Sequence, residues 1–199
     1  GPISGERPAG LRRVILDEAT RLFADRGYGA TSVRQVVEAS GCTKPALYYY
    51  FDNKRALYLE AIREETDHIT GLLSQELAEA IRSGTIRARL ELGLRAFLAH
   101  VERNPRGMRL LLRAELRPEP GAPEVDFESV HDAHTAMIAE LLRLGRSVGE
   151  IRADVDIEEA AYAICGMIDH RLQRWLHGRP LPATLTQSVL DIFLRGVAT

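Results

Sequence analysis

Residues 44–57 read KPALYYYFDNKRAL, and this stretch places three consecutive tyrosines between the only two lysines of the chain. Pro45 suits the first turn of a helix, where no amide donor is needed, and Asp52 and Asn53 stop that helix after Phe51. Successive side chains on a helix turn by about 100°, so three consecutive tyrosines cannot share one buried face. At least one tyrosine is therefore expected to point outward.

A helical wheel separates two faces of this short helix. Leu47 and Phe51 lie about 40° apart and define an inward arc, with Tyr50 at its edge. The outer arc holds Pro45, Tyr48 and Tyr49, with Lys44 on its border near the positive N-terminal end of the helix. The outward face is therefore predicted to be aromatic and cationic.

These residues alone leave two interpretations open. Phenol hydroxyls and ammonium groups donate hydrogen bonds to phosphate oxygens without requiring a given base, so the face suits a nucleic-acid backbone. Alternatively, the tyrosines form a core aromatic cluster and the lysines are solvated surface.

Two further helices are predicted before this one. The first carries the apolar stripe Leu11, Ile15, Ala19, Leu22 and Phe23. Gly27 follows where a left-handed C-cap belongs. The second begins after the N-cap candidate Ser32 and ends at Gly41, and the third begins at Thr43. Three helices with a tight glycine turn before the last one have the proportions of a helix-turn-helix motif, whose last helix enters the major groove of DNA.

The sequence over residues 17–57, DEATRLFADRGYGATSVRQVVEASGCTKPALYYYFDNKRAL, closely resembles the N-terminal domain of TetR-family transcriptional repressors. The resemblance covers roughly residues 11–57 and combines Leu-Phe, Gly-Tyr, Thr-Ser-Val, Ala-Ser-Gly and Leu-Tyr-Tyr-Tyr-Phe at the family's spacing. The chain departs from the family pattern at QVV in the second helix, at Cys42 where valine is usual, and at Tyr50 where histidine is frequent.

The resemblance implies a DNA-binding set of nine residues: Ser32, Arg34, Thr43, Lys44, Pro45, Tyr48, Tyr49, Tyr50 and Lys54. Arg34 is expected to reach a guanine edge or a phosphate. Thr43, Lys44 and Pro45 are expected to approach base edges, whereas the three tyrosines and Lys54 are expected to hold phosphates.

The predicted fold is all-α, with three parts. Residues 1–10 form a flexible N-terminus, residues 11–54 the helix-turn-helix DNA-binding domain, and residues 55–199 a helical ligand-binding and dimerisation domain. Apolar periodicity predicts further helices at 54–77, 86–101, 106–116, 125–144, from Asp156 to near Gly178, and 185–196. The strongest breaker among them is RPEPGAP at 117–123.

A homodimer is expected, because two reading helices related by a dyad can bind half-sites about 34 Å or more apart. The predicted dimer interface comprises Ile164, Ile168, Leu172, Trp175, Val189 and Phe193. The alternative is that the last two helices pack only within the monomer.

The family analogy points to a small, largely apolar effector. The predicted ligand-binding residues are Phe97, Val101, Met108, Leu112, His131, His134, Ile138, Met167 and Arg171. The predicted site contains no metal. His131 and His134 at helical spacing could share one, but such pairs are more often a pocket edge or solvated surface.

Composition limits the remaining function classes. Residues 1–54 carry 8 basic and 6 acidic residues, and the remaining residues carry 18 basic and 22 acidic, so the basic excess is mild and local. The sequence has no glycine-rich phosphate loop, GxSxG elbow or zinc-hydrolase signature, so neither an enzyme nor a cofactor is expected.

No stretch approaches 18 apolar residues and the two cysteines lie far apart, which predicts a cytoplasmic protein without membrane spans. The alternative function is a helical protein-interaction adaptor with weak or no DNA binding.

Overall fold

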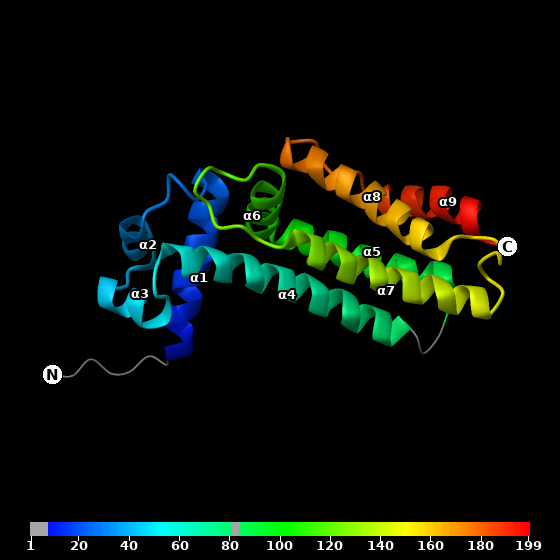
Figure 1. Ribbon diagram of the computed structural model, residues 1–199, viewed down its shortest axis with the longest axis horizontal. Coiled ribbons are helices and arrows are strands. Elements are labelled where there is room, and N and C mark those ends of the chain that lie inside the picture. Colours follow the sequence, from blue (N-terminus) through cyan, green and yellow to red (C-terminus); the bar gives the residue numbers. More distant parts are fainter. Residues whose placement is uncertain (1–7, 81–83) are drawn as a thin grey trace. The chain divides into compact units, whose positions relative to one another are not determined.

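The computed structural model describes residues 8–80 and 84–199, with side chains for 10–76 and 84–199 (Figure 1). These residues form two compact units. The first comprises the described residues up to Asp67 together with Asn104–Val125, and the second comprises the described residues of His68–Arg103 and Asp126–Thr199. Each unit is built of helices.

The first unit contains the helix-turn-helix motif. Its elements are α1 (Pro8–Arg26), α2 (Val33–Ser40), α3 (Lys44–Tyr50), the first part of α4 (Lys54–Ala80), and α6 (Pro105–Leu116). Helix α1 packs against α2, α3 and α6. The predicted apolar stripe of α1 forms core, since Ile15, Ala19, Leu22 and Phe23 are almost fully buried.

Local capping explains where α2 and α3 begin. The Gln35 amide donates to the Ser32 hydroxyl at 3.3 Å, and the Ser32 amide donates to the Gln35 side chain at 2.8 Å, so the two residues form a capping box. Gly41 ends α2 with a left-handed φ of 64°, as predicted. The Ala46 amide then donates to the Thr43 hydroxyl at 3.3 Å, which caps α3.

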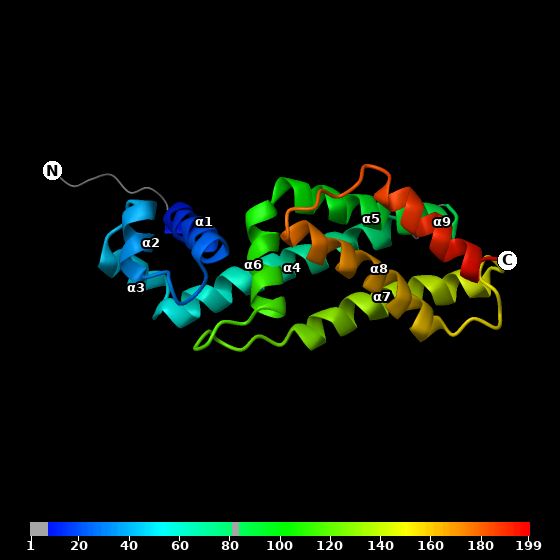
Figure 2. The same ribbon diagram turned by 90° about the horizontal axis from the view of Figure 1, so that it is seen from above.

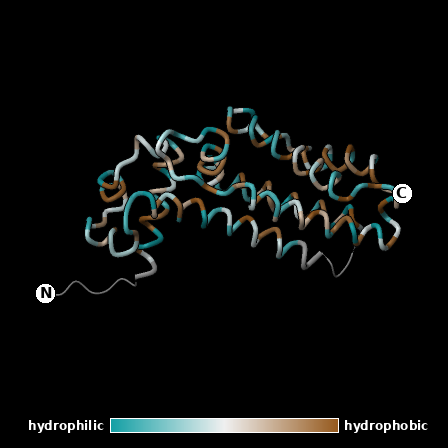
Figure 3. The backbone as a smooth tube through the Cα atoms, in the orientation of Figure 1, coloured by the Kyte–Doolittle hydropathy of each residue, from teal (hydrophilic) through white to brown (hydrophobic). Residues whose placement is uncertain are grey.

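The second unit contains the rest of α4 with α5 (Ile86–Arg103), α7 (Phe127–Ser147), α8 (Ile157–Leu176) and α9 (Leu185–Val197). Helix α7 packs along α8, and α9 packs against both α5 and α8 (Figure 2). Apolar and polar positions alternate along these helices (Figure 3), so each helix can bury one side and leave the other in solvent. An isolated bridge between Ile151 and Ala198 holds the end of α9 against the α7–α8 connection.

The compact units do not follow the predicted division after residue 54. They divide α4 after Asp67 and place Asn104–Val125 with the helix-turn-helix motif. The physical reason is that α6 packs on α1, about 90 residues earlier in the chain, and no local pattern signals a contact of that range. Of the predicted flexible N-terminus at 1–10, residues 1–7 lie outside the described residues, and Pro8 already opens α1.

No helix in the described part of the chain combines the length and apolar character that crossing a membrane requires.

Candidate nucleic-acid interface

Helix α3 is oriented as its helical wheel predicts. Leu47 is fully buried and Phe51 is 4% exposed, whereas Tyr48 is 41% exposed and Tyr49 is 79% exposed. Two of the three tyrosines therefore point outward, which argues against a core aromatic cluster.

The outward face of α3 is aromatic and cationic. Its exposed positions are Thr43, Lys44, Pro45, Tyr48 and Tyr49. The Lys44 ammonium lies 5.8 Å from the centre of the Tyr48 ring. Tyr50 is half-buried, and its ring meets the Tyr49 ring edge-on with 5.0 Å between centres. The face offers hydroxyl and ammonium donors side by side, which suits phosphate oxygens.

The two predicted contacts from α2 are both exposed. Ser32 already serves the capping box, so its hydroxyl is committed locally. The Arg34 guanidinium donates to the Glu38 carboxylate at 2.7 Å, and this hydrogen bond raises the pKa of Arg34. Both partners are solvent-exposed, so the ion pair is weak and exchangeable for a phosphate.

Lys54 has a role within the chain that the sequence does not reveal. Its ammonium donates to the carbonyl oxygens of Tyr28 at 2.9 Å and Thr31 at 3.1 Å, and it lies 4.0 Å from the centre of the Tyr28 ring. An ammonium has three donors, and two of them are used here. Lys54 therefore holds the α1–α2 turn, and its predicted phosphate contact would use the remaining donor.

The α1–α2 turn is fixed from inside the first unit. Gly27 adopts a left-handed φ of 86°, and the buried Thr31 hydroxyl donates to the Gly27 carbonyl at 2.8 Å. The Tyr28 ring packs edge-on against Tyr58, with 4.9 Å between centres, and Tyr58 packs against Phe23 at 5.0 Å. The turn that precedes α2 is thus attached to the core.

Two more residues that hold this turn come from far along the chain. The Gly29 amide donates to Glu119 at 2.9 Å, and the Arg113 guanidinium donates to the Ala24 carbonyl at 3.1 Å. The sequence offers Arg113 only as a candidate for an effector carboxylate or a surface ion pair and does not indicate Glu119, because nothing in RPEPGAP or in α6 shows that either residue contacts the α1–α2 turn. Tyr28 and Thr31, also missed, had a local signal in the Gly-Tyr-Gly-Ala-Thr turn.

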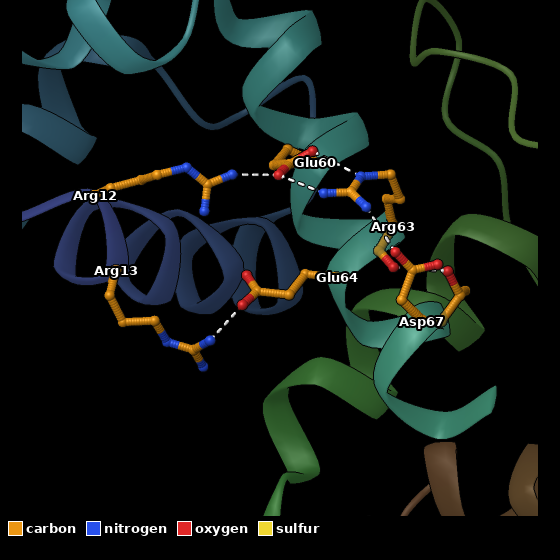
Figure 4. Close-up of polar contacts among 7 residues, drawn as sticks. Arg12, Arg13, Glu60, Arg63, Glu64 and Asp67 are labelled. Carbon is orange, nitrogen blue, oxygen red and sulfur yellow. Dashed lines mark hydrogen bonds and ion pairs between the residues drawn. The ribbon is translucent and has the colours of Figure 1, made fainter. Parts of the chain in front are cut away.

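Ion pairs tie α1 to α4 (Figure 4). Glu60 pairs with Arg12, and it also accepts two hydrogen bonds from Arg63, at 2.9 and 2.8 Å. These bonds, mainly those from Arg63, hold the pKa of Glu60 below its ordinary value. The Arg12 guanidinium lies 5.3 Å from the centre of the Phe51 ring, so the same group also contacts the residue that ends α3.

A second pair runs beside it. Arg13 on α1 pairs with Glu64 on α4 (Figure 4). Both pairs are partly or largely exposed, so each contributes about 1 kcal/mol or less by itself. Together they help to hold α1 against α4, the two helices that flank α2 and α3.

A buried carboxylate joins α4 to the start of α6. Glu65 is 7% exposed and accepts a hydrogen bond from the Asn104 amide group at 2.6 Å. Asn104 also caps α6, because the Gly107 amide donates to its side-chain oxygen at 3.3 Å. A side chain at Gly107 would overlap the Glu65 carboxylate, so glycine allows this close approach. Helix α6 is therefore fixed at its N-terminus as well as along α1.

The predicted effector residues do not lie in one unit. Met108 and Leu112, on α6, are buried in the first unit. The second unit contains Phe97, Val101, His131, His134, Ile138, Met167 and Arg171. Of these, Val101 is fully buried and Arg171 is exposed, while the other five are half-buried.

His134 is a half-buried polar residue among the predicted effector residues of the second unit. Its Nε2 lies 3.0 Å from the Thr70 hydroxyl, so α7 contacts α4 there. Burial, and then the neighbouring His131, lower the pKa of His134, which favours the neutral ring. In the described residues, no group of three or more His, Cys, Asp or Glu is placed to hold a metal ion.

An open hollow is found elsewhere in the second unit. It is lined by Arg87, Asp191, Leu194, Arg195, Ala198 and Thr199, and it contains none of the predicted effector residues.

The predicted dimer residues are core of a single chain. Ile164, Ile168, Leu172, Val189 and Phe193 are each less than 9% exposed, and Trp175 is half-buried. Periodicity identified the buried stripe of α8 and α9, and that stripe packs within the protomer. The exposed residues on these helices include Tyr162 at 54% and Ile192 at 66%.

Two family models match the chain. Residues 15–61 match the model described as bacterial regulatory proteins, tetR family, and residues 83–197 match the tetracyclin repressor-like C-terminal domain.

Curated relatives agree with these matches. The chain is 31% identical over 160 residues to the HTH-type transcriptional repressor AcnR of Corynebacterium glutamicum, covering 78% of this chain and 76% of that one. It is 28% identical to the HTH-type transcriptional repressor KstR2 of Mycolicibacterium smegmatis, covering 98% and 95%. Among solved structures, a TetR-like transcriptional regulator from Rhodococcus sp. RHA1 superposes with a TM-score of 0.76 at 22% identity, covering 97% and 98%, which shows a shared fold.

Proposed function

The chain belongs to the TetR family of bacterial regulatory proteins, and from that premise we propose that it represses transcription as a homodimer bound to a palindromic operator and released by a small, largely apolar effector. Its relatives named above are transcriptional repressors, which favours a DNA-binding regulator over an interaction adaptor or an enzyme.

One observation carries the DNA-binding part of the proposal. Helix α3 buries Leu47 and Phe51 and leaves Tyr48, Tyr49 and Lys44 exposed. Solvent-facing phenols beside an ammonium bury little apolar surface, whereas they suit a phosphate backbone. Thr43 and Pro45 are exposed at the start of the same helix, and their proposed approach to base edges rests on the family resemblance.

The dimer surface is proposed to be the exposed side of α8 and α9. On α8 the exposed positions Tyr162, Gly166 and His170 follow helical spacing. An added Cβ at Gly166 would meet nothing within 4 Å in the single chain, so the helix offers an open, flat site for close approach. On α9, Ile192 is 66% exposed, and a partner subunit packed there would bury this large apolar side chain.

The effector part of the proposal rests on the second unit. Phe97, Ile138 and Met167 are apolar yet only half-buried there. His134 lies one turn before Ile138 on α7, and burial lowers its pKa, which favours the neutral ring. Incompletely covered apolar side chains with few polar groups suit a small apolar ligand.

Selection of bound DNA from a random pool, using the full chain, tests the proposal. We expect enrichment of an inverted repeat whose half-site centres lie about 34 Å or more apart. A salt titration on the selected DNA should then show affinity falling steeply as salt rises, because phosphate contacts release counterions.

Two outcomes of this experiment would contradict all or part of the proposal. If no sequence is enriched and no salt-dependent binding to any duplex is found, DNA binding is excluded and the adaptor alternative is favoured. If single, unrepeated sites are enriched, the dimer is wrong but DNA recognition stands.

A further inference from the structure

We propose that Glu119, together with Arg113, is a positioning residue for operator binding: it fixes the α1–α2 turn and thereby the placement of the reading helices. The inference rests on the proposed DNA-binding function and adds to it a residue more than 60 positions beyond the helix-turn-helix motif. Glu119 acts through the turn, and its role needs no contact with DNA.

The carboxylate of Glu119 is fitted to the turn. Its Oε2 accepts a hydrogen bond from the Gly29 amide at 2.9 Å, and its Oε1 lies against Gly27. An alanine Cβ at Gly27 would collide with that carboxylate, and Gly27 has a left-handed φ of 86°. Glycine at position 27 therefore provides both the backbone conformation and the space that Glu119 occupies.

Arg113 orients this carboxylate. Its guanidinium lies 3.4 Å from Glu119 Oε1 and donates to the carbonyl oxygens of Ala24 at 3.1 Å and Asp25 at 3.3 Å. Those carbonyls belong to the last turn of α1, where a cation is favoured by the helix dipole. Arg113 and Glu119 together thus hold both the end of α1 and the turn that leaves it.

The turn is held from its other side by Lys54. The Lys54 ammonium donates hydrogen bonds to the Tyr28 and Thr31 carbonyl oxygens, while the Glu119 carboxylate accepts one from the Gly29 amide. Side chains from two later parts of the chain therefore pair with three backbone groups of the turn at residues 27–31. Ser32, which caps α2, follows Thr31 directly, so the orientation of this turn sets where α2 begins.

Positioning and charge predict opposite results for loss of Glu119. Removing a negative charge from a protein that binds a polyanion favours binding on electrostatic grounds alone. Releasing the turn instead lets α2 and α3 depart from the geometry that a specific site requires, which weakens binding. The sign of the change therefore identifies the role.

The test uses the full-length protein and the DNA that the wild type selects from a random pool. Glu119→Ala removes both contacts, whereas Glu119→Gln keeps an acceptor for the Gly29 amide and loses the charge. We expect Glu119→Ala to lower affinity for the selected DNA about tenfold, as loss of a charged hydrogen bond predicts, and Glu119→Gln to fall between it and the wild type. Glu124→Ala, at an exposed acid of the same unit, serves as the matched control and should bind like the wild type.

Affinity is measured well below the melting temperature, and the active fraction is determined by stoichiometric titration. Two further measurements distinguish positioning from general destabilisation. Binding to random-sequence DNA should change less than binding to selected DNA, because non-specific contacts tolerate a displaced motif. Amide hydrogen exchange across residues 27–32 should be faster in Glu119→Ala than in the wild type.

Unchanged or tighter binding of selected DNA by Glu119→Ala would overturn the inference while leaving the proposed function intact. If the alanine variant fails to fold, Glu119→Gln decides by the same criterion. Absence of selected DNA for the wild type would instead be failure of the proposed function.

Discussion

The ammonium of Lys54 lies 4.0 Å from the centre of the Tyr28 ring and donates a hydrogen bond to the Tyr28 carbonyl at 2.9 Å. Lys54 begins α4, and Tyr28 lies in the turn that precedes α2. One side chain thus joins the helix that follows the reading motif to the turn that precedes it.

Lys54→Met tests which role this lysine plays. The change keeps the aliphatic stem and removes the donor to Tyr28 and Thr31, so affinity for selected DNA should fall. If the ammonium only positions the turn, the slope of log affinity against log salt should match that of the wild type. A slope reduced by about one would show that Lys54 holds a phosphate, as the sequence alone predicts.

Tyr49 offers the cleanest test of the outward face of α3, because it is 79% exposed. Tyr49→Ala should change the free energy of unfolding by less than about 0.5 kcal/mol, since the ring is largely in solvent. It should weaken binding to selected and random DNA alike, by about 1 kcal/mol, because a phosphate contact carries no sequence information. Tyr49→Phe isolates the hydroxyl. Unaltered binding by both variants would remove Tyr49 from the interface.

Glu60 predicts a pH dependence of stability. Its hydrogen bonds from Arg63 and its pairing with Arg12 lower its pKa from the ordinary 4.5. A carboxylate with a depressed folded pKa stabilises the protein above pH 4.5, and this contribution is lost as pH falls through the folded pKa. Glu60→Gln should therefore be less stable than the wild type at about pH 7, and the difference should be smaller at about pH 3.

Urea unfolding at both pH values measures this difference. Glu124→Gln, at an exposed acid, is the control and should track the wild type throughout. If the difference in free energy of unfolding between Glu60→Gln and the wild type is as large at the lower pH as at about pH 7, the effect arises from packing and not from the charge.

Two helical glycines predict opposite effects of the same substitution. A Cβ at Gly107 would overlap the buried Glu65 carboxylate and lie 2.7 Å from the Asn104 amide nitrogen, so Gly107→Ala should destabilise by about 1–3 kcal/mol. A Cβ at Gly71 would meet nothing within 4 Å, so Gly71→Ala should stabilise by about 1 kcal/mol. Thermal unfolding measures both. If both substitutions change the stability equally, the Glu65 side chain moves aside for the new methyl group without a measurable cost.

Ile192 tests the proposed dimer surface. Ile192→Glu should produce a monomer by sedimentation, because it places a charge in a desolvated interface. Val148→Glu is the matched control, since Val148 is also an exposed apolar residue, at 61%, beyond the end of α7. A dimer that survives Ile192→Glu as well as Val148→Glu would place the interface elsewhere.

The effect of tertiary context is clearest at the last two helices. The apolar period correctly placed Ile164 and Phe193 on one stripe of each helix, but it could not say what covers that stripe. A buried stripe looks the same in sequence whether a neighbouring helix or a second subunit covers it. The structure shows that the protomer covers it, so the proposed interface moves to the exposed side, around Tyr162 and Ile192.

The sequence by itself determined the local features: the glycine that ends α2, the capping residues Ser32 and Thr43, and the outward turn of Tyr48 and Tyr49. Each depends on backbone geometry and side-chain spacing over a few residues, which a sequence pattern records directly. Only the tertiary structure decided that α6 packs on α1 and that Glu119 reaches Gly29, 90 residues away. Such contacts depend on which surfaces the whole chain brings together, and no short stretch of sequence records that choice.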